Sequence, residues 1–231
     1  MLKINRHQNM GSSNLGWLRS LFHFSFAEYF NRYNMNFGVL RVLNDDLIYP
    51  NTGFDTHPHK DMEIISYVVD GRLTHGDSMG NENTIERGHV QYMSAGSGVF
   101  HSEHNYTDKV SRFLQIWIMP DKKGHFPTYG DMRFDWDERV NKLLHMVSPK
   151  EGNAPIKINQ DVNIFSLFLE DKKIINFKVS ENRQAYIVQI EGNSNINDVE
   201  LFERDSLETI GEDLKIISES DSHYLIIEMS K

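Results

Sequence analysis

The fold is decided by a stretch that reads Thr56-His57-Pro58-His59-Lys60-Asp61-Met62-Glu63-Ile64-Ile65-Ser66-Tyr67-Val68-Val69-Asp70-Gly71. Its second half is rich in β-branched and aromatic residues and ends at an Asp-Gly pair, which is typical of a strand followed by a tight turn. Its first half places His57 and His59 two residues apart. In a strand, residues i and i+2 point to the same face, about 6.6 Å apart. The stretch therefore predicts β-structure with two imidazoles on one face.

Strand-like runs of this kind recur along the chain and are separated by turn residues. They cover residues 37–43, 63–69, 89–93, 113–119, 164–169, 185–190 and 223–229. Helical periodicity is weak, and residues 17–30 and 135–144 are the only modest helical candidates. The regular spacing of short strands predicts an all-β sandwich or barrel.

A faint internal repeat is visible. Residues 67–71 align with residues 188–192 when Gly71 is superposed on Gly192, an offset of 121 residues. At this offset His57 falls on Lys178, so the second copy has no metal site. A polar stretch with Pro and Gly at residues 148–153 suggests a domain boundary there. We expect an N-terminal metal-binding domain at residues 1–148 and a C-terminal domain without a metal site at residues 149–231.

A second pair of metal-capable side chains is found at His101 and Glu103, again two residues apart. Six of the eleven His residues fall within the 48 residues from His57 to His104. If the strands that carry His57, His59, His101 and Glu103 lie side by side, three imidazoles and one carboxylate converge. Such a set suits a divalent transition metal such as Fe, Cu, Ni, Mn or Zn rather than Mg or Ca.

The composition limits the residue types that can hold a metal and the classes of partner that the protein can bind. The chain has no Cys, so a metal must be held by His and carboxylates. It carries 24 Lys and Arg against 33 Asp and Glu, a formal charge of -9 without a basic run, which disfavours direct nucleic-acid binding. No secretion signal or membrane span is recognisable, and we therefore expect a cytoplasmic protein that does not bind membranes.

Taken together, the motifs resemble the cupin superfamily and, within it, the pirin family, which includes bacterial pirin-like quercetin 2,3-dioxygenases. The resemblance is densest over residues 53–105, from the His57-Pro58-His59 motif to the His101-Ser102-Glu103 motif. It implies a bicupin fold of two antiparallel jelly-roll β-barrels. It also implies that His57, His59, His101 and Glu103 are the four protein ligands of one divalent metal. Fe(II) is the first expectation, and Cu, Ni, Mn, Co and Zn are alternatives.

The chain departs from the general cupin pattern at the acidic ligand. Cupins usually take this ligand from the first motif, which here is Glu63, whereas pirins take it from the second motif, which here is Glu103. We favour Glu103 as the ligand and expect Glu63 to hold the outer ring N–H of a His. His75 and His104 flank the motifs, but a lone His is more often structural or solvated, and we leave both outside the predicted site.

The resemblance implies a dioxygenase that opens the central ring of a flavonol such as quercetin with O₂ and releases carbon monoxide. Glu103 would then serve as ligand and as the base that accepts the flavonol hydroxyl proton. The partners would be the flavonol, or a related phenolic, and O₂, and the protein would be a monomer. The alternative is a non-catalytic, metal-containing regulatory module that binds a protein partner in a redox-dependent way.

Overall fold

The computed structural model describes residues 2–231, and its regular secondary structure consists of β-strands apart from two short 3₁₀ helices. All seven predicted strand runs overlap observed strands, and the all-β prediction is confirmed. The described residues form two compact units. The N-terminal unit comprises residues 10–134 and 158–160, and the C-terminal unit comprises residues 2–9, 135–157 and 161–231.

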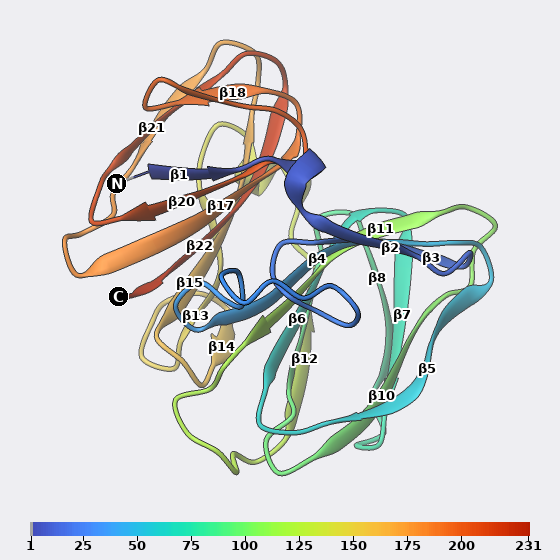
Figure 1. Cartoon of the computed structure of the whole chain (residues 1–231). Coiled ribbons are helices and arrows are strands. Elements are labelled where there is room, and N and C mark those ends of the chain that lie inside the picture. Colours follow the sequence, from blue (N-terminus) through green and yellow to red (C-terminus); the bar gives the residue numbers. More distant parts are fainter. Residues whose placement is uncertain (1) are drawn as a thin grey trace. The chain divides into compact units, whose positions relative to one another are not determined.

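The N-terminal unit contains a seven-stranded and a four-stranded sheet. In spatial order, the larger sheet consists of β12 (Thr128–Met132), β9 (Val90–Ser94), β6 (Glu63–Asp70), β11 (Ser111–Ile118), β4 (Leu40–Ile48), β3 (Leu18–Phe22) and β2 (Gly11–Asn14). The smaller sheet consists of β5 (Thr52–His59), β10 (Val99–Asn105), β7 (Arg72–Asp77) and β8 (Glu82–Glu86), and Figure 1 shows β5, β10 and β7 beside one another.

The C-terminal unit repeats this plan. Its larger sheet consists of β1 (Leu2–Asn5), β20 (Ser206–Ile210), β17 (Arg183–Glu191), β22 (Ser222–Ser230), β15 (Val162–Leu169), β13 (Leu144–Pro149) and β14 (Ile156–Ile158). Its smaller sheet consists of β16 (Ile174–Phe177), β21 (Leu214–Ser218), β18 (Ser194–Ile196) and β19 (Val199–Leu201). Two 3₁₀ helices, η1 (His7–Asn9) and η2 (Trp136–Arg139), complete this unit.

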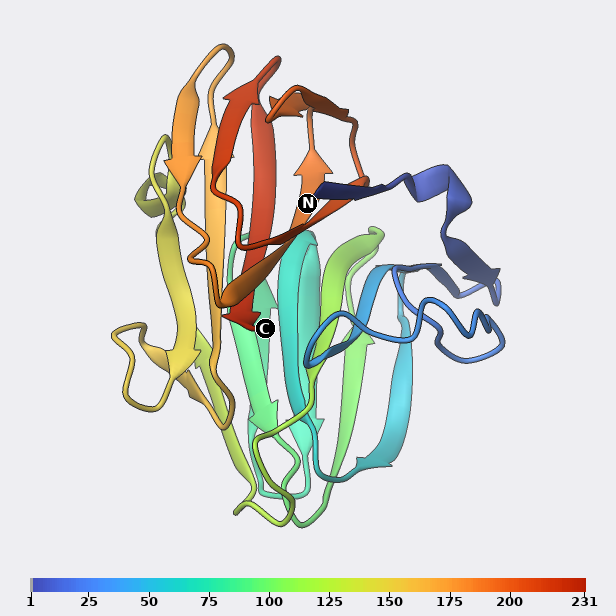
Figure 2. The same ribbon diagram turned by 60° about the vertical axis from the view of Figure 1, so that its left-hand side comes forward.

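This division differs from the expected boundary at residues 148 and 149 at both ends. The first strand, β1, pairs antiparallel with β20 of the C-terminal unit. Figures 1 and 2 both show this dark-blue strand beside the orange and red strands of that unit. Strand β13 pairs with β15, which brings residues 135–149 into the same unit. Both departures follow from strand pairing between residues far apart in sequence.

The helical expectation for residues 17–30 is wrong. Residues 18–22 form β3, in which Leu18, Ser20 and Phe22 are buried while Arg19 is exposed. This two-residue period fits one buried face of a strand paired with β4. The expectation for residues 135–144 is also wrong, because only the single 3₁₀ turn η2 forms there.

The cores lie between the two sheets of each unit. In the N-terminal unit, a cluster joins Leu73 and Ile85 of the smaller sheet to Ile48, Val68 and Phe113 of the larger one. In the C-terminal unit, a more extensive apolar cluster contains residues from both sheets. Burial of this apolar surface is the main stabilising contribution to each unit.

The internal repeat read from the sequence corresponds to two equivalent strands. Strand β6 is followed by Gly71 at φ +78°, and β17 is followed by Gly192 at φ +75°. A Cβ atom at Gly71 would lie 2.6 Å from Ser111 Oγ, and one at Gly192 would lie 2.5 Å from Ser222 Oγ. Both serines begin the neighbouring strand, β11 or β22. Glycine is required at both turns by the backbone conformation and by lack of space.

Candidate metal centre

Three imidazoles converge between the sheets of the N-terminal unit. His57 and His59 lie on β5, and His101 lies opposite His57 on the adjacent strand β10. The ring centroids are 4.5 Å apart for His57 and His101, and 4.8 Å apart for the two pairs that include His59. Each ring offers one nitrogen to a group whose members all lie within 4.8 Å of one another. The structure thus brings together the three predicted His residues.

The free nitrogens of these rings face one another. Nδ1 of His57 lies 2.8 Å from the carbonyl oxygen of Asp55 and must donate to it, which leaves Nε2 as an acceptor. This Nε2 lies 3.1 Å from Nε2 of His101. Nε2 of His59 is buried and has no hydrogen-bond partner. His101 Nε2 therefore donates to His57 Nε2, and a metal ion would replace the proton between them, so that both nitrogens could act as ligands.

The electrostatic environment keeps two of the rings neutral at physiological pH. Burial, together with the neighbouring His101 and His57 rings, lowers the pKa of His59 to about 4. Burial, together with His57 and His75, lowers the pKa of His101 to about 3. A neutral imidazole is the form that ligates metals.

These residues fit a first-row divalent metal. Two ligand nitrogens about 2.1 Å from one ion, at right angles, are about 3.0 Å apart, close to the 3.1 Å between Nε2 of His57 and Nε2 of His101. The partnerless Nε2 of His59 is a buried polar atom that an ion would satisfy. The all-nitrogen triad suits Fe, Co, Ni, Cu or Zn better than Mg or Ca.

Glu103 lies on β10 two residues after His101, and both side chains are buried. Its carboxylate accepts three hydrogen bonds from the larger sheet. Ser66 Oγ donates to Oε1 at 2.6 Å, Gln91 Nε2 donates to Oε1 at 3.1 Å, and Gln115 Nε2 donates to Oε2 at 3.2 Å. Glu103 forms a second group of potential ligands with His75 and His101. His101 therefore belongs to both groups.

Glu63 is not part of either group of potential metal ligands. Its buried carboxylate accepts hydrogen bonds from Tyr92 Oη at 2.7 Å and Ser94 Oγ at 2.7 Å, and from the backbone and side chain of Asn159. The expected bond to a His ring does not occur among these contacts. Asp61, at φ +51°, interrupts the extended chain between His59 and Glu63, so the two-residue period of one strand does not relate these two side chains.

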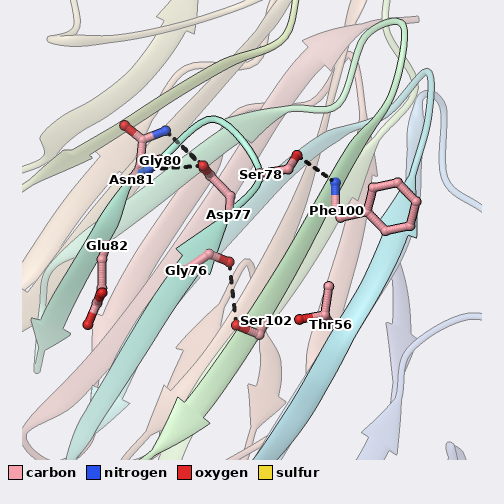
Figure 3. A pocket seen from close by; sticks show the side chains of 9 residues that line it. All are labelled: Thr56, Gly76, Asp77, Ser78, Gly80, Asn81, Glu82, Phe100 and Ser102. Atoms are coloured by element: carbon pink, nitrogen blue, oxygen red, sulfur yellow. Dashed lines mark hydrogen bonds between the residues drawn. The ribbon is translucent and has the colours of Figure 1, made fainter.

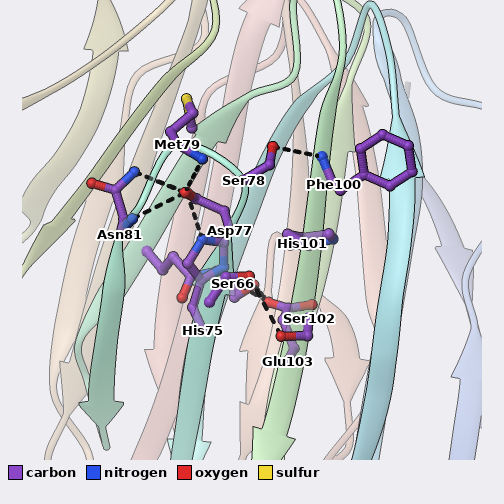
Figure 4. Close-up of polar contacts among 12 residues, drawn as sticks. Ser66, His75, Asp77, Ser78, Met79, Asn81, Phe100, His101, Ser102 and Glu103 are labelled. Atoms are coloured by element: carbon purple, nitrogen blue, oxygen red, sulfur yellow. Dashed lines mark hydrogen bonds and ion pairs between the residues drawn. The ribbon is translucent and has the colours of Figure 1, made fainter.

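His75, which we left outside the predicted site, is a member of the second group of potential ligands and is fully buried. Its Nε2 lies 2.9 Å from Asp77 Oδ2, and its Nδ1 lies 3.1 Å from Gln91 Nε2. Burial opposes ionisation of Asp77, but hydrogen bonds from His75, Asn81 and Met79 lower its pKa below the usual range. Figure 4 shows these residues around the turn that joins β7 to β8.

The polar residues around Glu103 form one transverse row across the larger sheet. Gln115 is paired in register with Asn44 on one side and Ser66 on the other, and Ser66 is paired with Gln91. The sequence carries no local signal for this row, because its members come from four strands. Only the strand register places their side chains together.

A cavity of about 590 Å³ adjoins His57. It is lined by Trp17, residues 51–55, His57 and His104. Trp17 and Phe54 contact each other edge to face, with ring centroids 5.2 Å apart. His104, also left outside the predicted site, is therefore a wall residue of this cavity. Its aromatic lining suits a planar apolar ligand.

A second groove, of about 400 Å³, includes Thr56, Phe100 and Ser102 (Figure 3). These residues alternate in sequence with His57, His101 and Glu103, so their side chains point to the opposite face of the smaller sheet. The burial pattern agrees, because Phe100 is exposed whereas His101 is buried. This groove is distinct from the metal centre.

Both groups of potential metal ligands found among residues 2–231 lie in the N-terminal unit. Within this described part of the chain, the structure contains no α-helix with the length and hydrophobicity needed to span a bilayer.

Comparison with known proteins identifies the family. The pirin family matches residues 4–118, and the quercetinase C-terminal cupin domain matches residues 145–229. The quercetin 2,3-dioxygenase of Escherichia coli K12 is 38% identical, with 99% of each chain covered. A pirin-like protein of Caulobacter vibrioides is 41% identical, with 85% of each chain covered.

Solved structures of relatives have the same fold as this chain. The crystal structure of YhhW from Escherichia coli has a TM-score of 0.94 at 37% identity, covering 99% of this chain and 97% of that one. A crystal structure of the same bacterial pirin in complex with nickel(II) also has a TM-score of 0.94, at 36% identity, covering 100% of this chain and 99% of that one. The expected bicupin fold is thereby confirmed, and this chain belongs to the pirin family of cupin proteins.

Proposed function

We propose that this protein is a metal-dependent dioxygenase that opens the central ring of a flavonol such as quercetin with O₂ and releases carbon monoxide. The observation that carries the proposal is the convergence of three imidazoles beside an aromatic cavity of about 590 Å³. A relative that carries the name quercetin 2,3-dioxygenase, with 99% of each chain covered, supports the choice of substrate.

His57, His59 and His101 would hold the metal, with Glu103 as the fourth ligand. A bound divalent ion supplies Lewis acidity, which favours deprotonation of a chelating hydroxyl group, and a redox-capable centre for reaction with O₂. Three or four protein ligands leave positions free for substrate. We expect Fe(II) first, with Cu, Ni, Mn, Co and Zn as alternatives, and the nickel complex of a relative supports a first-row metal.

Glu103 would accept the proton of the flavonol hydroxyl. Ser66 has one hydroxyl proton and two acceptors within reach, Glu103 Oε1 at 2.6 Å and Gln115 Oε1 at 2.8 Å. When Glu103 is ionised, Ser66 donates to it. When Oε1 of Glu103 carries a proton, Ser66 can accept that proton and donate to Gln115 instead. The same three side chains therefore satisfy both protonation states of the proposed base.

Trp17 and Phe54 would hold the planar rings of the flavonol. Their edge-to-face arrangement borders the cavity beside His57, and an aromatic substrate would stack or pack edge-on against them.

The test combines metal analysis with O₂ uptake and trapping of carbon monoxide on quercetin. Wild type is compared with His57→Ala, and His125→Ala is the control because His125 pairs with the exposed Asp121 in a loop. We expect metal, O₂ uptake and carbon monoxide in wild type and in the control, and their loss in His57→Ala. A fully metal-loaded wild type that consumes no O₂ with quercetin would refute the proposal and favour the regulatory module.

A further inference from the structure

A hydrogen-bonded chain links a surface turn to Glu103. Asp77 contacts His75, His75 contacts Gln91, and Gln91 contacts Glu103, at 2.9, 3.1 and 3.1 Å. The side chains of Asp77 and His75 are both fully buried. Figure 4 shows the Asp77, His75 and Glu103 side chains on β7 and the adjacent β10.

Only one assignment of donors and acceptors is consistent along this series of hydrogen bonds. Oδ1 of Asp77 already accepts the backbone N–H groups of Met79 and Asn81, and the Asn81 amide donates to both carboxylate oxygens. Asp77 is therefore an acceptor, and Nε2 of His75 must carry the proton that it accepts. Nδ1 of a neutral His75 is then an acceptor, so Gln91 must turn its NH₂ group toward it.

The orientation of Gln91 leaves its carbonyl oxygen buried without a partner. An unsatisfied buried acceptor is destabilising, so a strong local requirement must hold the amide this way. The requirement is met by its two N–H groups, which donate to His75 Nδ1 and Glu103 Oε1. A reversed amide would place oxygen against both of these acceptors.

The same contacts argue against a second metal at His75, His101 and Glu103. Both ring nitrogens of His75 are engaged, Nε2 with Asp77 and Nδ1 with Gln91, so this ring has no nitrogen free for an ion. An ion at this position would have to displace Gln91. The group is accounted for by hydrogen bonding, not by ligation of an ion of its own.

We propose that Asp77 and His75 are positioning residues, which fix the amide of Gln91 so that it holds the carboxylate of Glu103 next to His101, one of the three imidazoles. Through Gln91 they set the affinity of the metal centre. This inference rests on the proposed metal site but not on the flavonol reaction. Outer hydrogen-bond partners of this kind typically change metal affinity by about 10- to 100-fold.

The decisive variant is Asp77→Asn, which keeps the shape of the side chain. Its Oδ1 can still accept the backbone N–H groups of the turn, but an NH₂ group now faces His75. His75 must then carry its proton on Nδ1, and Gln91 must turn its oxygen toward it, so the donor to Glu103 is lost. The control is Asn81→Ala, which removes turn contacts but leaves the contact between Asp77 and His75 intact.

The measurement is the affinity of the metal-free full-length protein for Co²⁺, by competition with a chelator, with the Co²⁺ absorption spectrum and the melting temperature recorded in parallel. We expect Asp77→Asn and Gln91→Leu each to weaken Co²⁺ binding by about 10-fold or more, with an altered spectrum. The control should stay within about twofold of wild type, and the double variant should be no weaker than Gln91→Leu alone, because Asp77 acts through Gln91.

Several results would overturn the inference: unchanged affinity in Asp77→Asn, additive losses in the double variant, or two Co²⁺ ions per wild-type chain. Failure of wild type to bind Co²⁺ would overturn both this inference and the metal site itself. Tight Co²⁺ binding with the expected pattern, but no reaction of the metal-loaded protein with quercetin, would refute only the flavonol reaction.

Discussion

Ser66 and Ile187 occupy the same position in the two larger sheets. Each lies on the inner face of a strand, β6 or β17, that ends at a turn with a positive-φ glycine, Gly71 or Gly192. Ser66 donates to Glu103, whereas Ile187 is a fully buried member of the apolar core. One position in a duplicated plan thus serves a polar site in one unit and a hydrophobic core in the other.

The difference between a polar and an apolar residue extends along the whole transverse row of register-paired residues in each larger sheet. Register pairing places Phe165, Ile226, Ile187 and Leu207 in the C-terminal unit where the N-terminal unit has Asn44, Gln115, Ser66 and Gln91. An apolar row has no donors to hold a buried carboxylate. This explains in structural terms why a site of the N-terminal kind does not arise from the equivalent positions of the C-terminal unit.

Replacing Glu63 should reduce stability and leave metal binding intact. Glu63→Ala removes the acceptor of Tyr92, Ser94 and Asn159, and leaves buried donors unsatisfied. We expect the free energy of unfolding to fall by about 3 kcal/mol, measured by urea denaturation, with unchanged metal per chain. Loss of metal from a folded Glu63→Ala protein would restore Glu63 as a ligand.

The stability of the protein should depend on the ionisation of Asp46. Burial, only partly offset by a hydrogen bond from Ser20, raises the pKa of Asp46 from 3.8 to about 7. Between these values the unfolded chain releases the proton while the folded chain retains it, so the free energy of unfolding falls as pH rises. The slope is at most about 1.4 kcal/mol per pH unit, and the contribution is constant above the folded pKa.

Asp46→Asn removes the carboxyl group and with it the contribution of Asp46 to the pH dependence of the free energy of unfolding, so a comparison with wild type measures that contribution. The variant should gain stability over wild type as pH rises from 5 to 7, by up to about 3 kcal/mol, and the gain should level off above pH 7. Asp45→Asn is the control, because it breaks the two-contact ion pair with Arg112 and should lower stability. A stability difference between Asp46→Asn and wild type that does not change with pH would contradict the assignment.

Metal binding should be visible through Trp117. The rings of Trp117 and His59 meet edge to face with centroids 4.8 Å apart. Addition of Ni²⁺ or Co²⁺ to metal-free protein should therefore quench Trp117 fluorescence. Trp117→Phe should lose most of the quenching, whereas Trp136→Phe, in the C-terminal unit, should retain it. Equal quenching in both variants would place the ion away from His59.

Gly71→Ala should be more destabilising than Gly16→Ala. Both glycines have positive φ, +78° and +85°, but only a Cβ at Gly71 meets other atoms, Ser111 Oγ at 2.6 Å and Ser111 Cα at 3.0 Å. We expect a loss of about 1 kcal/mol for Gly16→Ala and about 3 kcal/mol for Gly71→Ala, measured by urea denaturation. Similar losses would show that backbone conformation alone sets the requirement.

Local sequence patterns were sufficient to predict the strands and to select the three His residues as potential metal ligands. The two-residue period of an extended chain places His57 with His59 and His101 with Glu103, and the repeated strand runs specify an all-β fold. The same period does not extend to Glu63, because β5 ends at His59 and Asp61, in the left-handed region, separates it from the strand that begins at Glu63. The helical expectation at residues 17–30 failed because pairing of β3 with β4 outweighed a weak local pattern.

By itself, the sequence determined which side chains can bind a metal and that they lie on strands, because strand periodicity and residue chemistry are local properties. Only the tertiary structure showed that Glu103 lies close to His101 and His75, and which residues hold its carboxylate. Glu103 meets Ser66, Gln91 and Gln115 because register aligns three strands of one sheet beneath a fourth strand from another. Register depends on the packing of whole faces, and no single segment of the chain encodes it.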